Sequence, residues 1–326
     1  MNPFFTPTNT LPPLGTAPIG EEQKRRRKRI EDIIDFGLPP FPHSVLELTT
    51  ILSDPSADAK KAGKVVRTDP SLSAQVLRLC NSPMFGLRTR VISIEQATIL
   101  IGLKHLRSLA VTCSLVNYSG KGLPRDQVMN FWRHSFLAAR LSEHLAVQTD
   151  YSEKEQAYIA GLLHDIGQLP QWMLATEEGA KAKTQPPANW TDNLSVERDH
   201  FGMDHCEIGS SMAVTWNFMP SFIDVLGYHH DPREAQHDPV LVEIIGTVER
   251  YLLAKGKAAP SLDGASAQQP DAQPGSDHPV SPAPAAAMKT FTDAGPESVV
   301  EMLDKEYDQL IPVVEAAVAS AVGNIR

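Results

Sequence analysis

The histidines of this chain are concentrated in one stretch, in a pattern that suits metal chemistry. Eight of the eleven fall between residues 124 and 255, and several stand beside carboxylate residues. Imidazole and carboxylate groups are the donors that zinc, iron and manganese take from proteins, and a bound metal can activate water for hydrolysis. The candidate ligands are His134 in FWRHSF, His164 and Asp165 in GLLHDIG, His205 in GMDHCEIG, and His229 with His230 in GYHHDP.

Each candidate also has a simpler interpretation. The six residues sit in or beside apolar helical patterns, where a single histidine is more often a hydrogen-bonded core residue than a ligand. In that case His134, His164 and Asp165 form a buried polar network that is retained for packing. The presence of all six in one half of the chain favours a site. On these patterns alone, both interpretations stay open.

Helices are the elements expected to carry these residues. The apolar residues of LPPFPHSVLELTTILSD recur at spacings of three and four, which is typical of a helix with one buried face. Start signals at Asp69-Pro70-Ser71 and at Ser93 mark two further helices. No segment alternates between apolar and polar residues for long enough to indicate a sheet. The sequence therefore predicts an all-α protein.

Composition divides the chain into segments. Residues 258–287 are rich in Pro, Ala, Ser and Gln and cannot bury enough surface to offset their chain entropy. Beyond them apolar residues recur at helical spacing, with one expected break at Pro312. The predicted organisation is a flexible tail over 1–20, a basic helix over 21–37, an N-terminal helical subdomain over 38–123, a second helical subdomain over 124–255, a disordered linker over 256–287 and a C-terminal helical segment over 288–326.

The overall charge limits the partners that the protein can bind. A net charge of −9 argues against a general nucleic-acid binder, because attraction to phosphate requires a basic surface. One basic run is interpreted as a solvated helix face, with an anionic partner such as nucleic acid or lipid as the alternative. That run comprises Lys24, Arg25, Arg26, Arg27, Lys28 and Arg29.

The cysteines and the hydropathy indicate a compartment. Cys80, Cys113 and Cys206 lie far apart and form no C-x-x-C pair, which favours a reducing environment. No run approaches the ~18 apolar residues that a membrane helix requires. We therefore expect a cytoplasmic protein that does not associate with membranes.

Long strings of the chain resemble a known family. DPSLSAQVLRLCNSPMFG, followed by ISIEQATILIGLKHLRSL and later by AYIAGLLHDIGQLP, is similar to the HDOD domain, the "HD-related output domain" of bacterial signalling proteins. The resemblance covers residues 30–252. It implies an all-α fold in which an N-terminal helical subdomain packs on a second one that is similar to HD-type phosphohydrolases.

The resemblance also implies a ligand set. In catalytic HD proteins a His, a His-Asp pair and a later Asp bind one metal, and His134 and His164-Asp165 match the first three positions. The position of the final Asp falls on Gly246, which has no side chain. Glu243 and Glu249 stand one turn either way and are the residues that could replace it.

Further likenesses and departures concern a second metal. His205 and His229 or His230 match additional ligands of HD-GYP phosphodiesterases, but the D-G-x-G-Y-P signature is missing after YHHDP. Gln168 stands where HDIGK would supply a lysine. The six candidates are therefore expected to form an incomplete metal site with no catalytic residue. We expect no cofactor, with a divalent metal (iron, manganese or zinc) as the alternative.

These departures decide the expected function. Metal-assisted hydrolysis of a phosphoester needs a full ligand set and an open position for substrate. We expect a non-catalytic regulatory or scaffolding HDOD protein of bacterial signal transduction, which binds a protein partner and has a nucleotide as its candidate small ligand. The alternative is a metal-dependent phosphohydrolase or phosphodiesterase that acts on a nucleotide or a cyclic nucleotide.

Overall fold

The described part of the protein is built from helices. This computed structural model describes residues 20–37, 66–67, 70–81, 87, 89–102, 106, 123, 125–182, 194–216, 218–255 and 289–322. These residues form helices, turns and bends, and no strand occurs among them. The predicted all-α fold is confirmed. Most of the predicted tail, much of the N-terminal subdomain and the whole predicted linker lie outside the described residues, so those boundaries stay predictions.

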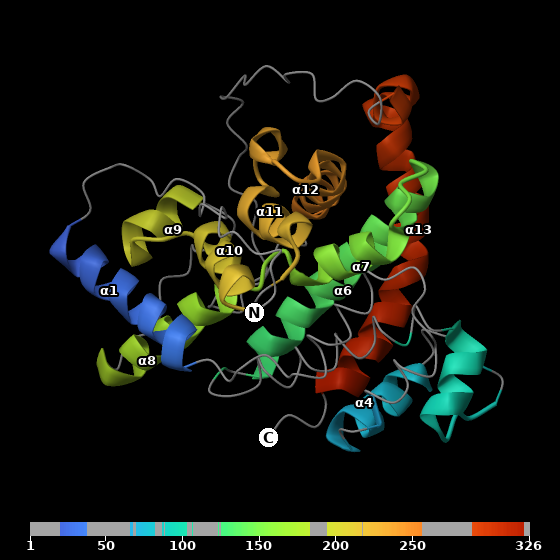
Figure 1. Ribbon diagram of the computed structural model, residues 1–326, viewed down its shortest axis with the longest axis horizontal. Coiled ribbons are helices and arrows are strands. Elements are labelled where there is room, and N and C mark those ends of the chain that lie inside the picture. The colour runs from blue at the N-terminus through green and yellow to red at the C-terminus, as the bar shows by residue number, and fades with distance from the viewer. Residues whose placement is uncertain are drawn as a thin grey trace, which may run out of the picture.

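The helices follow one another in the order shown in Figure 1. Their bounds are α1 Glu21–Asp32 with a π-helical extension Ile33–Gly37, α4 Pro70–Cys80, α6 Arg125–Gln148, α7 Lys154–Leu163, α8 Gln168–Ala182, α9 Leu194–Phe201, α10 His205–Thr215, α11 Pro220–Tyr228, a 3-10 turn Pro232–Glu234, α12 Pro239–Ala254 and α13 Lys289–Val322.

Two helix starts in the N-terminal part agree with the sequence signals. Helix α4 begins at Pro70, whose missing N–H costs nothing in a first helical turn. The helical stretch from residue 94 is preceded by Ser93, whose hydroxyl accepts a hydrogen bond from the backbone N–H of Gln96. Both predicted starts are confirmed.

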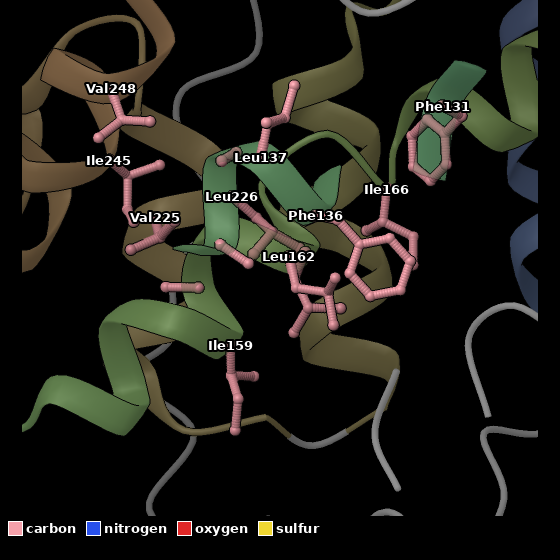
Figure 2. Close-up of a cluster of buried hydrophobic side chains, with 14 of the residues drawn as sticks. Phe131, Phe136, Leu137, Ile159, Leu162, Ile166, Val225, Leu226, Ile245 and Val248 are labelled. Carbon is pink, nitrogen blue, oxygen red and sulfur yellow. The ribbon is translucent and has the colours of Figure 1, made fainter. Parts of the chain in front are cut away.

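The core of the second half is organised around the long helix α6. Helix α6 packs against α7, α12 and α13 and buries large side chains such as Phe131, Trp132 and Phe136. Figure 2 shows how Leu137 of α6 meets residues of α7, α11 and α12 in one continuous apolar cluster. Burying a side chain of this size contributes about 1.5–3 kcal/mol to folding. The apolar framework therefore fixes α6 relative to the helices on either side of it.

Helix α13 continues through the proline that was expected to break it. The helix runs unbroken from 289 to 322, and Pro312 lies on its exposed side. Its opposite side buries Leu303, Leu310 and Val314. The expected break at Pro312 is wrong because packing of this apolar face on α6 compensates for the one hydrogen bond that proline cannot donate.

Polar contacts also tie α13 to the second half. Glu315 accepts two hydrogen bonds from the guanidinium of Arg133 in α6, at 2.5 and 2.9 Å. Asp304 accepts a hydrogen bond of 2.6 Å from the hydroxyl of Tyr251 in α12. Helix α13 also packs against α4. It therefore contacts both the N-terminal part and the second half of the chain (Figure 1).

The basic run of α1 is neutralised by carboxylates, and the helix docks on α8 and α9. Each of its six cations lies within 4 Å of an acidic side chain: Arg29 pairs with α8, Arg25 and Arg26 pair with both α1 and α8, and the other three pair within α1. Gly202 follows α9 with a φ of +76°, and a Cβ there would lie 2.8 Å from the carbonyl oxygen of Gln23. These pairings agree with the solvated-face interpretation, although an anionic partner stays an untested prediction.

We expect the docking of α1 to weaken in acid because of His200 in α9. Burial and the adjacent guanidinium of Arg26 lower the pKa of His200 to about 4, whereas an unfolded histidine titrates near about 6.5. Between these values the unfolded chain binds a proton that the folded chain does not, so stability falls as pH falls through that window. The melting temperature of metal-free His200→Gln should therefore drop less than that of the metal-free wild type between pH 7 and pH 4. Equal drops would contradict this assignment.

One structural finding concerns membranes. Among the described helices, none combines the length and the apolar character needed to cross a bilayer.

Candidate metal centre

The six predicted ligands meet at one place in the second half. His134 lies in the middle of α6, His164 and Asp165 follow the end of α7, His205 opens α10, and His229 and His230 follow the end of α11. Five of them are at most 2% exposed, and His230 is partly exposed. A seventh residue, Glu249 of α12, joins them. Five different helices or their ends thus supply the cluster.

The first set of donors contains His134, His164, Asp165 and Glu249. One oxygen of Glu249, Oε2, lies 3.1 Å from Nε2 of His134 and 3.0 Å from Nε2 of His164. Oδ2 of Asp165 lies 3.4 and 3.6 Å from the same two nitrogens. The two Nε2 atoms are 3.2 Å apart. Two imidazoles and two carboxylates therefore converge on one point.

The second set of donors lies on the other side of Asp165. It contains His205, His229, His230 and Cys206, and their ligand atoms lie within 4.8 Å of one another. Nε2 of His205 is 3.3 Å from Nε2 of His229 and 3.2 Å from Nε2 of His230. Oδ1 of Asp165 lies 3.4 Å from Nε2 of His205 and 3.5 Å from Nε2 of His229. Asp165 thus faces one set with each of its oxygens.

The carboxylate of Asp165 is buried without a hydrogen bond from any described residue. The residue has 0% exposure, and neither of its oxygens has a hydrogen-bond partner. Oε1 of Glu249 is likewise buried and has no hydrogen-bond partner among the described residues. An unsatisfied buried acceptor costs about 1–3 kcal/mol, and more when it is charged. Cations between the imidazoles and these oxygens would satisfy them, so the carboxylates fit a metal centre.

Hydrogen bonds behind the centre fix which imidazole nitrogen faces inward. Nδ1 of His164 lies 2.8 Å from the carbonyl oxygen of Gly161, and Nδ1 of His229 lies 2.9 Å from that of Val225. A carbonyl oxygen can only accept, so these Nδ1 atoms carry the proton. Nδ1 of His205 faces the carboxylate of Glu197 at 2.9 Å. Because the protons point outward, the three Nε2 atoms can present lone pairs to a cation, as metal-bound histidines do.

The spacing of the donors agrees with common metal coordination. Metal–nitrogen bonds of about 2.0–2.1 Å in a tetrahedral site place neighbouring nitrogens about 3.3 Å apart. The separations of 3.2, 3.2 and 3.3 Å between facing Nε2 atoms match this value. Two neutral imidazoles would not direct lone pairs at each other over such a distance without a cation or a proton between them. The residues therefore fit two divalent metal ions that share Asp165.

The electrostatics of the first set require positive charge in its centre. Burial opposes the ionisation of Asp165, but His164 and the other imidazoles hold its pKa well below the usual range. Burial also opposes the charge of Glu249, and His134 with His164 lowers its pKa in the same way. In return, Glu249 and Asp165 raise the pKa of His134 well above its ordinary value against the effect of burial. The carboxylates stay ionised only while protons or metal cations sit among the imidazoles.

In the second set the pKa values of His229 and His230 shift in opposite directions. Burial lowers the pKa of His229, but Cys206 and Asp165 outweigh it and raise the value to about 10. Burial, His229 and His205 lower the pKa of His230 to about 2. His230 is therefore neutral at physiological pH and keeps a donor lone pair. It is also the histidine of the second set that reaches solvent.

Helix α12 brings an acidic side chain to the first set from a position other than Gly246. A Cβ at residue 246 would lie only 2.5 Å from the carbonyl oxygen of His229, so α12 touches the His229 backbone there and has no room for a carboxylate. Glu249, three residues later, points its carboxylate at His134 and His164 instead. Glu243 lies toward the surface and pairs with Arg250 at 2.8 Å. Glu249 thus supplies a fourth possible donor beside His134, His164 and Asp165, and the expectation of an incomplete metal site stays a prediction.

The HDIG segment lies directly against the backbone of α10 at Gly167, and this contact yields a prediction. A Cβ at Gly167 would clash severely with the carbonyl oxygen of His205, whereas a Cβ at Gly209 would meet only ordinary contacts at 3.5 Å. Gly167→Ala should therefore lower stability by about 1–3 kcal/mol through overpacking. Gly209→Ala should be neutral or stabilise α10. Urea unfolding of both variants checks this prediction, and equal stabilities would contradict it.

Two supporting residues were not among the predicted site residues. Glu197 in α9 binds Nδ1 of His205 and also accepts a hydrogen bond of 3.1 Å from Gln171 in α8. Cys206 lies beside its predicted neighbour His205. Glu197 carried no local signal, because the residues VERDH resemble an ordinary exposed turn of helix. The spacing of Cys206 from the other cysteines carries no metal signal, but its place directly after the candidate ligand His205 is one.

Comparisons with known proteins support the same fold. Residues 38–232 match the family model of the HDOD domain. An uncharacterized protein of Treponema pallidum is 26% identical over 62% of this chain, and the match spans 38% of that protein. A solved HDOD domain protein of unknown function from Geobacter sulfurreducens has a TM-score of 0.66, with 23% identity, and covers 91% of this chain and 98% of its own. A candidate phosphohydrolase from Shewanella amazonensis has a TM-score of 0.61, with 20% identity, and covers 90% and 98% respectively.

Proposed function

From the premise that the chain belongs to the HDOD domain family, we propose that it is a non-catalytic regulatory protein of bacterial signal transduction whose second half is organised by two divalent metal ions. The observation that carries this proposal is the pair of donor sets on either side of Asp165. His134, His164 and Glu249 would hold one ion, and His205, His229 and His230 the other. Bound metals of this kind would supply positive charge and Lewis acidity.

The residues of the chain would use this charge mainly to fix helices. Asp165 faces both sets and so connects α6 and α12, which carry His134 and Glu249, with α10 and the end of α11. Glu197 orients the ring of His205 from α9. Helix α13 packs on α6, which carries His134, and it also contacts α4 in the N-terminal part. A change in the position of α6 at the centre would therefore be passed to α13 by direct packing. Metal occupancy would thereby set the surface that a protein partner meets.

The setting of the centre supports a regulatory role over hydrolysis. Five of the six predicted ligands and Glu249 are at most 2% exposed, which leaves little room for a substrate at the donors. Gln168, which stands where a lysine could steady a phosphate, is buried and uncharged. The ion pairs that the structure shows for Asp165 and Glu249 are all with imidazole nitrogens. No arginine or lysine among the described residues pairs with either carboxylate.

A metal-dependent phosphohydrolase is the second candidate, and one observation favours it. Four possible donors in the first set, together with a second set that reaches solvent at His230, are what a two-metal hydrolase needs. The Shewanella amazonensis structures described as candidate phosphohydrolases share the fold at 20% and 15% identity. The nucleotide or cyclic nucleotide would approach from the His230 side.

The two candidates are separated by one experiment on tag-free protein. Metal-loaded wild type and His164→Ala are incubated with phosphomonoesters, nucleotides and cyclic dinucleotides, while hydrogen exchange of α13 is compared between metal-loaded and metal-free wild type. A regulatory protein gives equal, background-level hydrolysis in both and a metal-dependent change in the protection of α13. Turnover by wild type that disappears in His164→Ala, at an unchanged melting temperature, would establish the hydrolase instead.

A further inference from the structure

Cys206 lies inside the second donor set and has no other role among the described contacts. It follows His205 directly, in the first turn of α10, and its side chain is buried. Its Sγ atom is 3.9 Å from both ring nitrogens of His229. The sulfur and one nitrogen each of His205, His229 and His230 all lie within 4.8 Å of one another. A thiol in this place stands among metal ligands.

We propose that Cys206 is a thiolate ligand of the second metal position, which makes that position selective for zinc or ferrous iron over manganese and magnesium. The inference rests on the proposed two-metal centre and adds the identity of one ligand and the class of metal. The first position has only imidazole and carboxylate donors, so the two positions differ in chemistry. Soft thiolate donors favour zinc and iron, whereas carboxylates suit manganese and magnesium.

An independent feature points to a cation at the same place. Oδ1 of Asp165 is fully buried, accepts no hydrogen bond from a described residue and faces His205 and His229. Because this carboxylate oxygen faces two inward-facing imidazoles, it indicates a cation position independently of Cys206. Cys206 stands on the same set of histidines, and a tetrahedral metal–sulfur bond of about 2.3 Å implies sulfur–nitrogen separations of about 3.6 Å. Sγ of Cys206 lies 3.9 Å from Nε2 of His229 and equally far from Nδ1, so a shift of the thiol toward the Nε2 side would bring it to the same ion.

The proposed step is a simple exchange of a proton for a metal ion. The S–H bond of Cys206 breaks, the sulfur electron pair binds the divalent ion, and the proton passes to solvent. Nothing is oxidised or reduced. Metal binding to this position should therefore release one more proton than binding to a site of neutral imidazoles and ionised carboxylates.

Cobalt(II) is a suitable probe, because a thiolate-to-cobalt bond gives charge-transfer absorption in the near ultraviolet that nitrogen and oxygen ligands do not give. Full-length, tag-free protein is stripped with a chelator and titrated with cobalt. The matched variants are Cys206→Ser and Cys80→Ser, since Cys80 is also a buried free cysteine but lies in α4. Zinc and manganese affinities of the three proteins are then measured by competition.

The wild type and Cys80→Ser should both show the charge-transfer band, and Cys206→Ser should lack it. Zinc affinity at one of the two positions should fall by at least about tenfold in Cys206→Ser, since loss of even an outer hydrogen-bond partner costs that much. Manganese affinity should change less. If two cobalt ions bind without the band, or if the band survives in Cys206→Ser, the thiolate assignment is wrong while the two-metal centre stands. If no cobalt binds, the two-metal centre itself fails and the thiolate assignment with it.

Discussion

Asp165→Ala is expected to lose both metal ions and to destabilise the second half strongly. The carboxylate faces one donor set with Oδ2 and the other with Oδ1, so its removal takes a ligand from each. It also leaves buried imidazoles beside an empty space. Breaking a buried charge pair from one side costs about 3–5 kcal/mol. Lost metal binding adds to this, because an ion at a thousandfold excess over its dissociation constant stabilises by about 4 kcal/mol.

The test combines elemental analysis with thermal unfolding, and it needs a variant that folds. Asp165→Asn keeps the volume and removes the charge, so it should fold better than Asp165→Ala and still bind little metal. Asp224→Asn is the control, because Asp224 is an equally buried carboxylate that accepts hydrogen bonds from the backbone N–H groups of Gln236 and His237 away from the centre. It should lose stability and keep both ions. Full metal content in Asp165→Asn would show that Asp165 is not a shared ligand.

Glu249→Ala is expected to lose one metal ion and keep the other. Its Oε2 lies 3.1 and 3.0 Å from the Nε2 atoms of His134 and His164 and is the only described carboxylate oxygen besides those of Asp165 in the first set. The second set does not include Glu249. Metal content should therefore fall to about half. Metal affinity at the first position should fall by at least about tenfold, because loss of a residue that only hydrogen-bonds to a metal ligand already costs that much.

The position of the acid can be tested by moving it. Adding Gly246→Asp to Glu249→Ala should not restore the lost ion, because any side chain at 246 meets the carbonyl oxygen of His229 at 2.5 Å. Glu243→Ala is the matched control on the same helix, and it should keep both ions because Glu243 pairs with Arg250 at the surface. Restoration by Gly246→Asp would mean that α12 lies in the register expected from the family pattern.

The fold and six residues of the cluster could be predicted from sequence because local patterns carry them. Helical periodicity indicates an all-α chain. His164 and Asp165 stand out because they directly follow the apolar run AYIAGLL. His134 and His205 could be placed by likeness to the family. The convergence of these residues depends on how five helical segments pack together. The family resemblance implies that packing, whereas the apolar spacing alone does not.

The place of Glu249 in the cluster could not be fixed from sequence because helix register is a tertiary property. Residues 246 and 249 lie nearly one turn apart on the same side of α12, so a small shift of that helix decides which one faces His134. The contact between Gly246 and the backbone of His229 sets this register, and it is invisible in sequence. The family match ends at residue 232, before α12 begins. In α13 the same kind of long-range packing explains why Pro312 does not end the helix.

The metal content of the wild-type protein tests the two-metal centre most directly. Protein purified without a histidine tag and dialysed against buffer containing zinc, manganese and ferrous iron, and then against metal-free buffer, is measured by elemental mass spectrometry. Two sets of donors that share Asp165 predict about two equivalents of divalent metal per chain. A content well under one equivalent would contradict the two-metal centre and return the buried histidines to a polar network that serves packing alone.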